Sequence, residues 1–198
     1  MRHVWRTVVA VLVGAALTAC ASPDPAHPPA AGDHGTGDAG ARASDDPSTR
    51  FIGVIGARAQ HAPPFLGVPE TNFYCLRSFL DRKTGATQHQ LYVSDSYFGA
   101  ERHWNAARNG TGSPLRLVEI GRSEIACGES CSYLEEFAAN IPETELRANP
   151  QGLTVIFSAG SGAEKQISVS GAQITAQLAA VDAARRGAQP ASAAAAAR

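Results

Sequence analysis

The sequence predicts a mainly β domain, an antiparallel meander or sandwich of about seven strands with a short helix and a C-terminal amphipathic helix. Three observations lead to this prediction. Short apolar or alternating segments recur between residues 51 and 170, as buried or half-buried strands require. Turn-forming residues separate these segments, so neighbouring strands can pair as hairpins. Apolar residues at helical spacing then follow the last of these segments.

The first predicted strands lie in the N-terminal half of the domain. Residues 51–59 are apolar and end at a Pro-Pro pair. Residues 72–81 have the aromatic and apolar composition of a buried strand, and residues 87–94 alternate with a period of two. Gly85 lies in the turn between them and can adopt a positive φ angle, so the two segments predict a hairpin. The apolar face of the second segment carries His89, Leu91 and Val93.

Three further strands are expected in the middle of the chain. Residues 102–108 predict a strand that ends at Asn109-Gly110, a strong tight-turn dipeptide. Residues 115–126 predict a longer strand in which Gly121 marks a bend or bulge. This strand pairs with residues 132–141 through the turn Cys127-Gly-Glu-Ser-Cys131.

The C-terminal part of the domain combines a hairpin with two helices. Residues 142–147 predict a short helix, with proline at its first position and acidic residues in its first turn. Residues 153–159 and 165–170 alternate cleanly and predict another hairpin. Residues 172–186 predict the amphipathic helix, because Ile174, Leu178 and Val181 share one face.

Both ends of the chain differ from this domain in composition. A cationic start (Arg2, His3, Arg6) and a short apolar run from Val8 to Leu17 predict an export signal over residues 1–19. The apolar run is too short for a transmembrane helix. Residues 20–49 predict a disordered tether rich in Pro, Ala and Gly, residues 50–186 the globular domain, and residues 187–198 a low-complexity tail.

The end of the signal resembles a bacterial lipobox. The motif is Leu17-Thr18-Ala19-Cys20, directly after the apolar run. The resemblance implies lipidation of Cys20 and a lipid anchor in the membrane, although an ordinary signal cleaved after Ala19 stays an alternative. The residue after the cysteine is Ala21 rather than Asp, which by resemblance to sorting patterns favours the outer membrane, with the domain on its periplasmic face.

Three cysteines remain in the expected domain. An exported protein can form disulfides, and we predict one between Cys127 and Cys131. Cys75 lies in an apolar segment and is expected to be buried, although its pairing with either other cysteine stays open. The sequence indicates no metal site, because no histidine lies close to the Cys-x-x-x-Cys pair and two thiolates do not complete a zinc site.

Charge and motifs exclude several classes of function. The chain has 17 Lys and Arg against 18 Asp and Glu. Removal of the signal takes away Arg2 and Arg6, which leaves 15 against 18, or −3. Nucleic acid is therefore not an expected partner, because phosphate binding needs a basic surface. The sequence also lacks the common nucleotide, zinc-protease and serine-hydrolase motifs in their required context, so no cofactor is expected.

Aromatic and arginine residues alternate around residue 100, a composition typical of binding hot spots. We expect about half of these rings to pack in the core and the arginines to be solvated, with a binding patch as the alternative prediction. The residues of this predicted patch are Tyr97, Phe98, Arg102, Trp104 and Arg108. The adjacent acids Glu135 and Glu136 are expected on a solvated strand, where neighbours point to opposite faces.

The folded part, over about residues 72–186, resembles small β-rich envelope lipoproteins of no assigned activity. The resemblance lies in Tyr92-Val93, Trp104-Asn-Ala-Ala107, Tyr133 beside the Cys127/Cys131 turn, and the helical segment 177–182. We therefore expect a non-enzymatic binding or accessory module for another envelope component. The alternative is a periplasmic hydrolase for cell-wall or periplasmic substrates that uses His89 or His103 with an acid.

Overall fold

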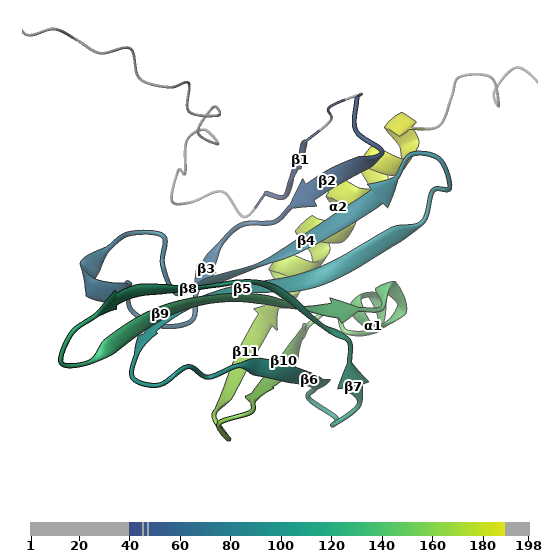
Figure 1. Cartoon of the computed structure of the whole chain (residues 1–198). Helices are drawn as coiled ribbons and strands as arrows, with labels where there is room; N and C mark the ends of the chain where they lie inside the picture. The colour runs from purple at the N-terminus through teal and green to yellow at the C-terminus, as the bar shows by residue number, and fades with distance from the viewer. Residues whose placement is uncertain (1–39, 45, 47, 189–198) are drawn as a thin grey trace, which may run out of the picture. The chain divides into compact units, whose positions relative to one another are not determined.

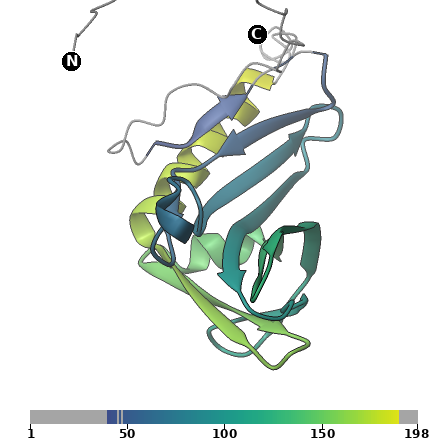
Figure 2. The same ribbon diagram turned by 60° about the vertical axis from the view of Figure 1, so that its left-hand side comes forward.

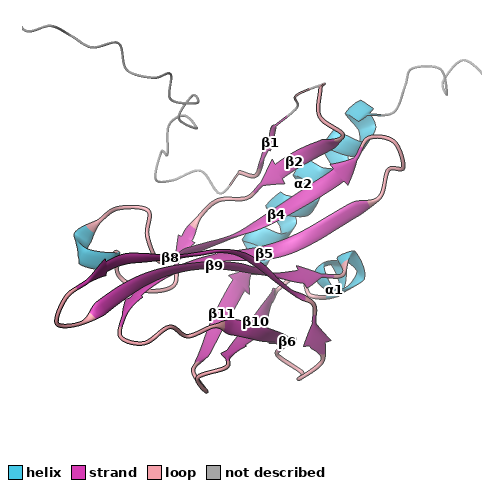
Figure 3. Cartoon of the chain, in the orientation of Figure 1, coloured by secondary structure: helices cyan, strands magenta, loops and turns pink. Residues whose placement is uncertain are grey.

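The computed structural model of the chain describes residues 40–44, 46 and 48–188, which form two antiparallel sheets and two α-helices (Figures 1 and 3). The predicted mainly β class is confirmed. Sheet A has seven strands in the order β1-β2-β4-β5-β9-β8, with β3 paired to β4. Its strands are β1 (Arg42–Ser44), β2 (Phe51–Ile55), β3 (Ala59–Gln60), β4 (Phe73–Asp81), β5 (Thr87–Phe98), β8 (Leu117–Cys127) and β9 (Cys131–Ile141).

Sheet B has four strands in the order β11-β10-β6-β7. They are β6 (Trp104–Asn109), β7 (Pro114–Leu115), β10 (Gly152–Ala159) and β11 (Glu164–Ser170). Two helices match the sequence predictions closely: α1 (Glu143–Ala148) between β9 and β10, and α2 (Gly171–Ala188) after β11. A 3₁₀ turn, η1 (Phe65–Gly67), lies in the loop before β4.

The connections depart from a simple meander. Strand β5 extends to Phe98, four residues beyond the predicted end, and pairs with β9 rather than with the next strand in sequence. The chain leaves sheet A after β5, contributes β6 and β7 to sheet B, and returns to sheet A for β8 and β9. Composition reveals each strand but not this long-range pairing, because the register between β5 and β9 depends on which faces become buried together.

The hydrophobic core lies between one face of sheet A and a second layer made of sheet B and α2 (Figure 2). Leu91 and Val93 of β5 face this core, and Ile174 brings the apolar side of α2 into it. Phe137 of β9 lies 5.2 Å from the Trp104 ring and 4.9 Å from the Phe157 ring, centroid to centroid. These three aromatic rings therefore join sheet A to sheet B.

Strand β8 is an edge of sheet A and carries two β-bulges. The pairing with β9 shifts between Glu119 and Gly121 and again between Glu124 and Ala126, so Ile120 and Ile125 are the extra residues. The first shift confirms the irregularity predicted at Gly121. In a regular strand, side chains alternate between the two faces of the sheet. The extra residue of each bulge shifts this alternation by one, so two residues that are three positions apart lie on the same face.

Secondary structure is present before the predicted boundary at residue 50. Residues 42–44 lie within the predicted tether, yet they form β1 and pair with β2, Arg42 opposite Ile55. This pairing satisfies backbone groups at the edge of β2. The predicted signal, Cys20, most of the tether and the end of the tail lie outside the described residues. Within the described part, no helix is long and apolar enough to cross a membrane.

The aromatic contact between the sheets yields a stability prediction. Phe137 is 1% exposed, so Phe137→Ala should lower the free energy of unfolding by about 3–5 kcal/mol through lost burial and a residual cavity. Phe98→Ala is the matched control, because Phe98 is 55% exposed, and it should cost about 1 kcal/mol or less. Urea denaturation measures both values, and equal losses would contradict this description of the core.

Candidate functional site

The five residues of the predicted patch do not form one surface. Tyr97 and Trp104 are 5% and 3% exposed, so these two rings pack in the core, and the alternative of an exposed patch does not hold for them. Phe98 is exposed and lies 4.8 Å from the Phe65 ring. Arg108 forms an ion pair with Glu164 at 3.0 Å. The rings are buried because β6 belongs to sheet B, whose inner face packs on sheet A.

Three of the predicted residues instead gather around the carboxylate of Glu135. The Tyr97 hydroxyl donates a hydrogen bond to Glu135 Oε1, and so do the backbone N–H groups of Arg102 at 3.0 Å and His103 at 3.1 Å. The backbone N–H of Trp104 donates to Oε2 at 3.3 Å. Glu135 was expected on a solvated strand but is 5% exposed, because this carboxylate anchors segment 102–104 to β9.

The surroundings keep Glu135 ionised. Burial alone raises the pKa of its carboxyl group, but the hydrogen bonds from Tyr97 and the three backbone N–H groups outweigh burial and lower it. Burial and the contact with Glu135 both raise the pKa of Tyr97. Glu135 is therefore a fixed negative charge and not a proton donor at neutral pH.

A cavity of about 260 Å³ adjoins the anchored segment and is lined by residues 103–104, 119–122 and 135–137. The first β-bulge of β8 places Glu119 and Arg122 on the same face as the anchor. At the cavity, His103 Nε2 lies 3.1 Å from Glu101 Oε2, and the Arg122 guanidinium donates a hydrogen bond to Nδ1. This pattern assigns the proton of a neutral His103 ring to Nε2.

The cavity carries the elements of acid–base chemistry without a nucleophile of the Ser, Thr or Cys type among its lining residues. His103 is half exposed and adopts a left-handed backbone conformation with φ of 57°. The indole N–H of Trp104 is buried, and within the described residues it has no hydrogen-bond partner. His103 is accessible, the lining carries charged side chains, and the Trp104 indole N–H is an unpaired donor among the described residues. These three features make the cavity one candidate site for a small polar ligand.

The second histidine named by the sequence, His89, lies in a different environment. Ser78 Oγ lies 2.8 Å from His89 Nδ1, and His89 Nε2 lies 3.2 Å from a Glu143 carboxylate oxygen. The composition is that of a Ser-His-acid chain, but Ser78 is 0% and His89 2% exposed. Gln177 of α2 donates a hydrogen bond to Ser78 Oγ at 2.8 Å and so extends this row of hydrogen-bonded side chains to α2. His89 lies in the interior, as its place on the apolar face of the strand indicated, and no substrate reaches this ring.

A larger candidate surface lies on the open face of sheet A. Leu76 faces the core and Ser78 bonds to α2, so the alternating residues Arg77 and Phe79 of β4 point to the opposite face. The Arg77 guanidinium lies 5.4 Å from the Phe79 ring centroid and 4.8 Å from that of Tyr92. Among the described elements, sheet B and α2 both pack on the other face.

Polar and apolar side chains extend this open face. Arg77 donates to Gln90 Oε1 at 2.9 Å, and Gln90 donates to Asn140 Oδ1 at 2.9 Å, which forms a row across β4, β5 and β9. Phe51 and Ile55 of β2 lie on the same face and are 45% and 41% exposed. We refer to Phe51, Ile55, Arg77, Phe79, Gln90, Tyr92 and Asn140 as the open-face row.

Sequence reasoning missed the open-face row. Residues 73–79 read Phe-Tyr-Cys-Leu-Arg-Ser-Phe, which indicated a buried strand because apolar residues dominate both faces. The available signal was Arg77 two residues before Phe79, with Tyr92 on the partner strand. Only the pairing of β4 with β5 brings the arginine and both rings together.

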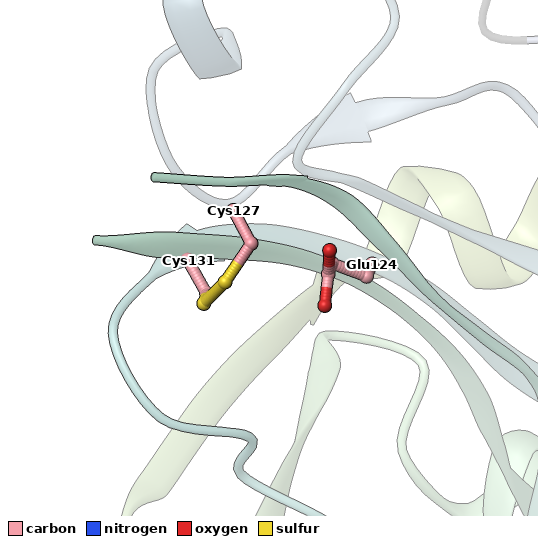
Figure 4. Close-up of side chains that lie close together, drawn as sticks. All are labelled: Glu124, Cys127 and Cys131. Carbon is pink, nitrogen blue, oxygen red and sulfur yellow. A yellow bond between two sulfur atoms is a disulfide. The ribbon is translucent and has the colours of Figure 1, made fainter. Parts of the chain in front are cut away.

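The predicted cysteine pair lies at the tip of the β8–β9 hairpin. Cys127 and Cys131 are directly paired residues, and their sulfur atoms lie within bonding distance, so the structure supports a disulfide (Figure 4). Cys75 is 4% exposed and is a free thiol, and burial raises its pKa to about 11. The buried thiol is therefore unreactive at neutral pH.

The His89 chain gives the fold a defined response to acid. Burial lowers the pKa of His89, and hydrogen bonds from Arg185 hold the pKa of Glu143 below its usual range despite partial burial. Both groups take up a proton more readily in the unfolded state, so the free energy of unfolding should fall as pH decreases. Each group lowers the free energy of unfolding once it starts to bind a proton in the unfolded state. For His89 this begins below about pH 6.5, and for Glu143 below about pH 4.5.

Urea titrations at several pH values test this response. His89→Gln should flatten the slope of unfolding free energy between pH 7 and pH 5 and leave the slope below pH 4.5 in place. His61 remains in the variant and keeps part of the first slope, because burial also lowers its pKa. An unchanged slope in His89→Gln would show that His89 does not titrate with unfolding.

The comparisons with known proteins assign no family to this arrangement. No protein-family model, no curated protein and no solved structure matches the chain. The chemistry of the cavity, the open-face row and the hairpin tip therefore has to be inferred from their own side chains.

Proposed function

We propose that this chain is a lipid-anchored outer-membrane protein whose β domain is a non-enzymatic binding module for another protein of the envelope. The signal-like N-terminus and the lipobox resemblance at Cys20 support the anchor. About 20 residues separate Cys20 from the start of the described domain. Such a stretch reaches at most about 70 Å, so a tethered domain stays concentrated near partners on the periplasmic face of the same membrane.

The observation that carries the binding role is Arg77 between two aromatic rings on the open face of sheet A. Arginine and aromatic residues dominate binding hot spots, because they combine large contact area with directional hydrogen bonds. Gln90 is 5% exposed and links Arg77 to Asn140 by hydrogen bonds, while Phe51 and Ile55 supply exposed apolar area. This mixture suits a protein surface with carboxylates and apolar side chains rather than a nucleic acid.

Site-specific crosslinking in cells tests this proposal. A photo-crosslinking residue at position 79 should capture a defined envelope protein, and the same residue at position 186 should not. Arg77→Ala should reduce the crosslinked yield at least about tenfold, because truncating a hot-spot residue costs about 2 kcal/mol or more. Arg186→Ala on exposed α2 is the matched control and should leave the yield unchanged.

Two results would contradict the proposal. Equal crosslinking from positions 79 and 186 would remove the open-face row as the binding surface. Release of Cys20→Ser to the soluble fraction is expected, and a variant that stays membrane-bound like the native protein would remove the lipid anchor.

The cavity at His103 favours a second candidate function, hydrolysis of a cell-wall or periplasmic substrate. His103 and Glu101 form the His-acid pair that such chemistry uses, and His103 lines the cavity. His103 Nδ1 is occupied by Arg122, so activation of water at this nitrogen requires that contact to open.

A substitution that preserves the backbone tests this second candidate. His103→Asn keeps a residue that tolerates the left-handed conformation, so the fold should persist. Any hydrolytic activity of the purified protein should fall at least about a hundredfold in this variant. Unchanged activity in a folded His103→Asn protein would place the chemistry elsewhere or remove it.

A further inference from the structure

The tip of the β8–β9 hairpin brings three metal-binding side chains together. One carboxylate oxygen of Glu124 and the sulfur atoms of Cys127 and Cys131 all lie within 4.8 Å of one another (Figure 4). In the part of the chain that the structure describes, this is the only such group of three His, Cys, Asp or Glu residues. The sequence indicated no metal site because no histidine lies close to the two cysteines and two thiolates alone do not complete a zinc site.

The second β-bulge supplies the third ligand. In a regular strand, residues three positions apart point to opposite faces, so Glu124 would point away from Cys127. The extra residue Ile125 shifts the register, and Glu124 pairs with Tyr133 while Cys127 pairs with Cys131. Tyr133 and Cys131 are two positions apart on β9, so their partners Glu124 and Cys127 share one face. Bulges near functional sites commonly re-aim a side chain in this way.

The three side chains are also accessible to solvent at the hairpin tip. Glu124 and Cys127 are exposed and Cys131 is half-buried. No ion pair of Glu124 occurs among the described residues, unlike Glu135 and Glu136, whose carboxylates accept hydrogen bonds from tyrosine hydroxyls. A carboxylate without a partner beside two sulfur atoms is available to a cation.

We propose that the hairpin tip is a redox-gated site that, when reduced, binds one thiophilic divalent cation of the Zn²⁺ class through Glu124, Cys127 and Cys131. A dithiol reductant gives two protons and two electrons to the disulfide, which becomes two thiols while the reductant becomes a disulfide. Binding of the cation then releases both thiol protons as the two Cys–metal bonds form. Two sulfurs and one oxygen leave the fourth tetrahedral position to water.

The disulfide and the metal exclude each other, because both need the same pair of sulfur atoms. An oxidising environment keeps the two sulfur atoms in the disulfide, and a reducing environment frees them to bind the cation. This site lies apart from the open-face row and does not depend on the proposed binding function.

Cobalt and zinc titrations of the full-length protein test the proposal. All samples carry Cys20→Ser, so that Cys75, Cys127 and Cys131 are the only thiols. Thiol labelling of unreduced, denatured protein should find one thiol, and labelling after reduction should find three. The reduced, folded protein should bind one Co²⁺ with a thiolate-to-cobalt charge-transfer band, and one Zn²⁺ should displace it. The oxidised protein should bind neither cation.

Variants separate the three ligands from the rest of the chain. The double variant Cys127→Ser, Cys131→Ser should lose binding, and Cys75→Ser should retain it. Glu124→Gln should weaken Zn²⁺ binding at least about tenfold, since even residues that only support a metal ligand contribute 10- to 100-fold to affinity. Glu119→Gln, an exposed glutamate on the same strand, is the control and should bind normally.

Three outcomes would overturn the site. The first is that the reduced protein, with the thiols of Cys127 and Cys131 free, takes up no Co²⁺. The second is that the oxidised protein binds the cation as well as the reduced protein does. The third is that Glu124→Gln binds Zn²⁺ as tightly as Glu119→Gln. The last result would mean that the two cysteines bind the cation without the carboxylate.

Discussion

The buried carboxylate of Glu135 fixes the point where the chain passes from one sheet to the other. It binds the backbone N–H groups of residues 102–104, which begin sheet B, while Glu135 itself belongs to β9 of sheet A. Asp95, its neighbour across β5 and β9, repeats the arrangement with side chains: it pairs with Arg102 at 2.9 Å and with Lys165 of β11 at 3.1 Å. Each buried charge needs its partners, because an unpaired one would cost several kcal/mol. The packing of Trp104 on Phe137, the shape of the cavity and the position of His103 all depend on this polar connection.

The sequence predicted local features well and tertiary pairing poorly. Period-two alternation located β5, β10 and β11, apolar composition located β4, and helical spacing located α2, because these patterns arise within a single element. The turn between the cysteines and the bulge at Gly121 were also predictable from residue type. The pairing of β5 with β9 was not, because it joins segments separated by two strands of the other sheet. Burial of Tyr97 and Trp104 follows from that pairing, so the sequence alone could not tell which aromatic residues around position 100 are buried and which, like Phe98, are exposed.

The adjacent acids Glu135 and Glu136 show how one strand serves two faces. Glu135 points inward and holds the crossover, whereas Glu136 lies on the open face and accepts a hydrogen bond from Tyr92. Sequence reasoning placed the two on opposite faces but treated both as solvated. Strand β9 thus connects the interior polar anchor to the row of arginine, amide and aromatic side chains. A change in its register would alter both faces at once.

The bulges of β8 have a consequence for neighbouring molecules. An exposed strand of 11 residues at the end of a sheet is a template on which a second chain can add a strand. Ile120 and Ile125 interrupt the regular spacing of backbone donors and acceptors along this edge. The two bulges therefore blunt the edge against continuous pairing with a strand of a second molecule.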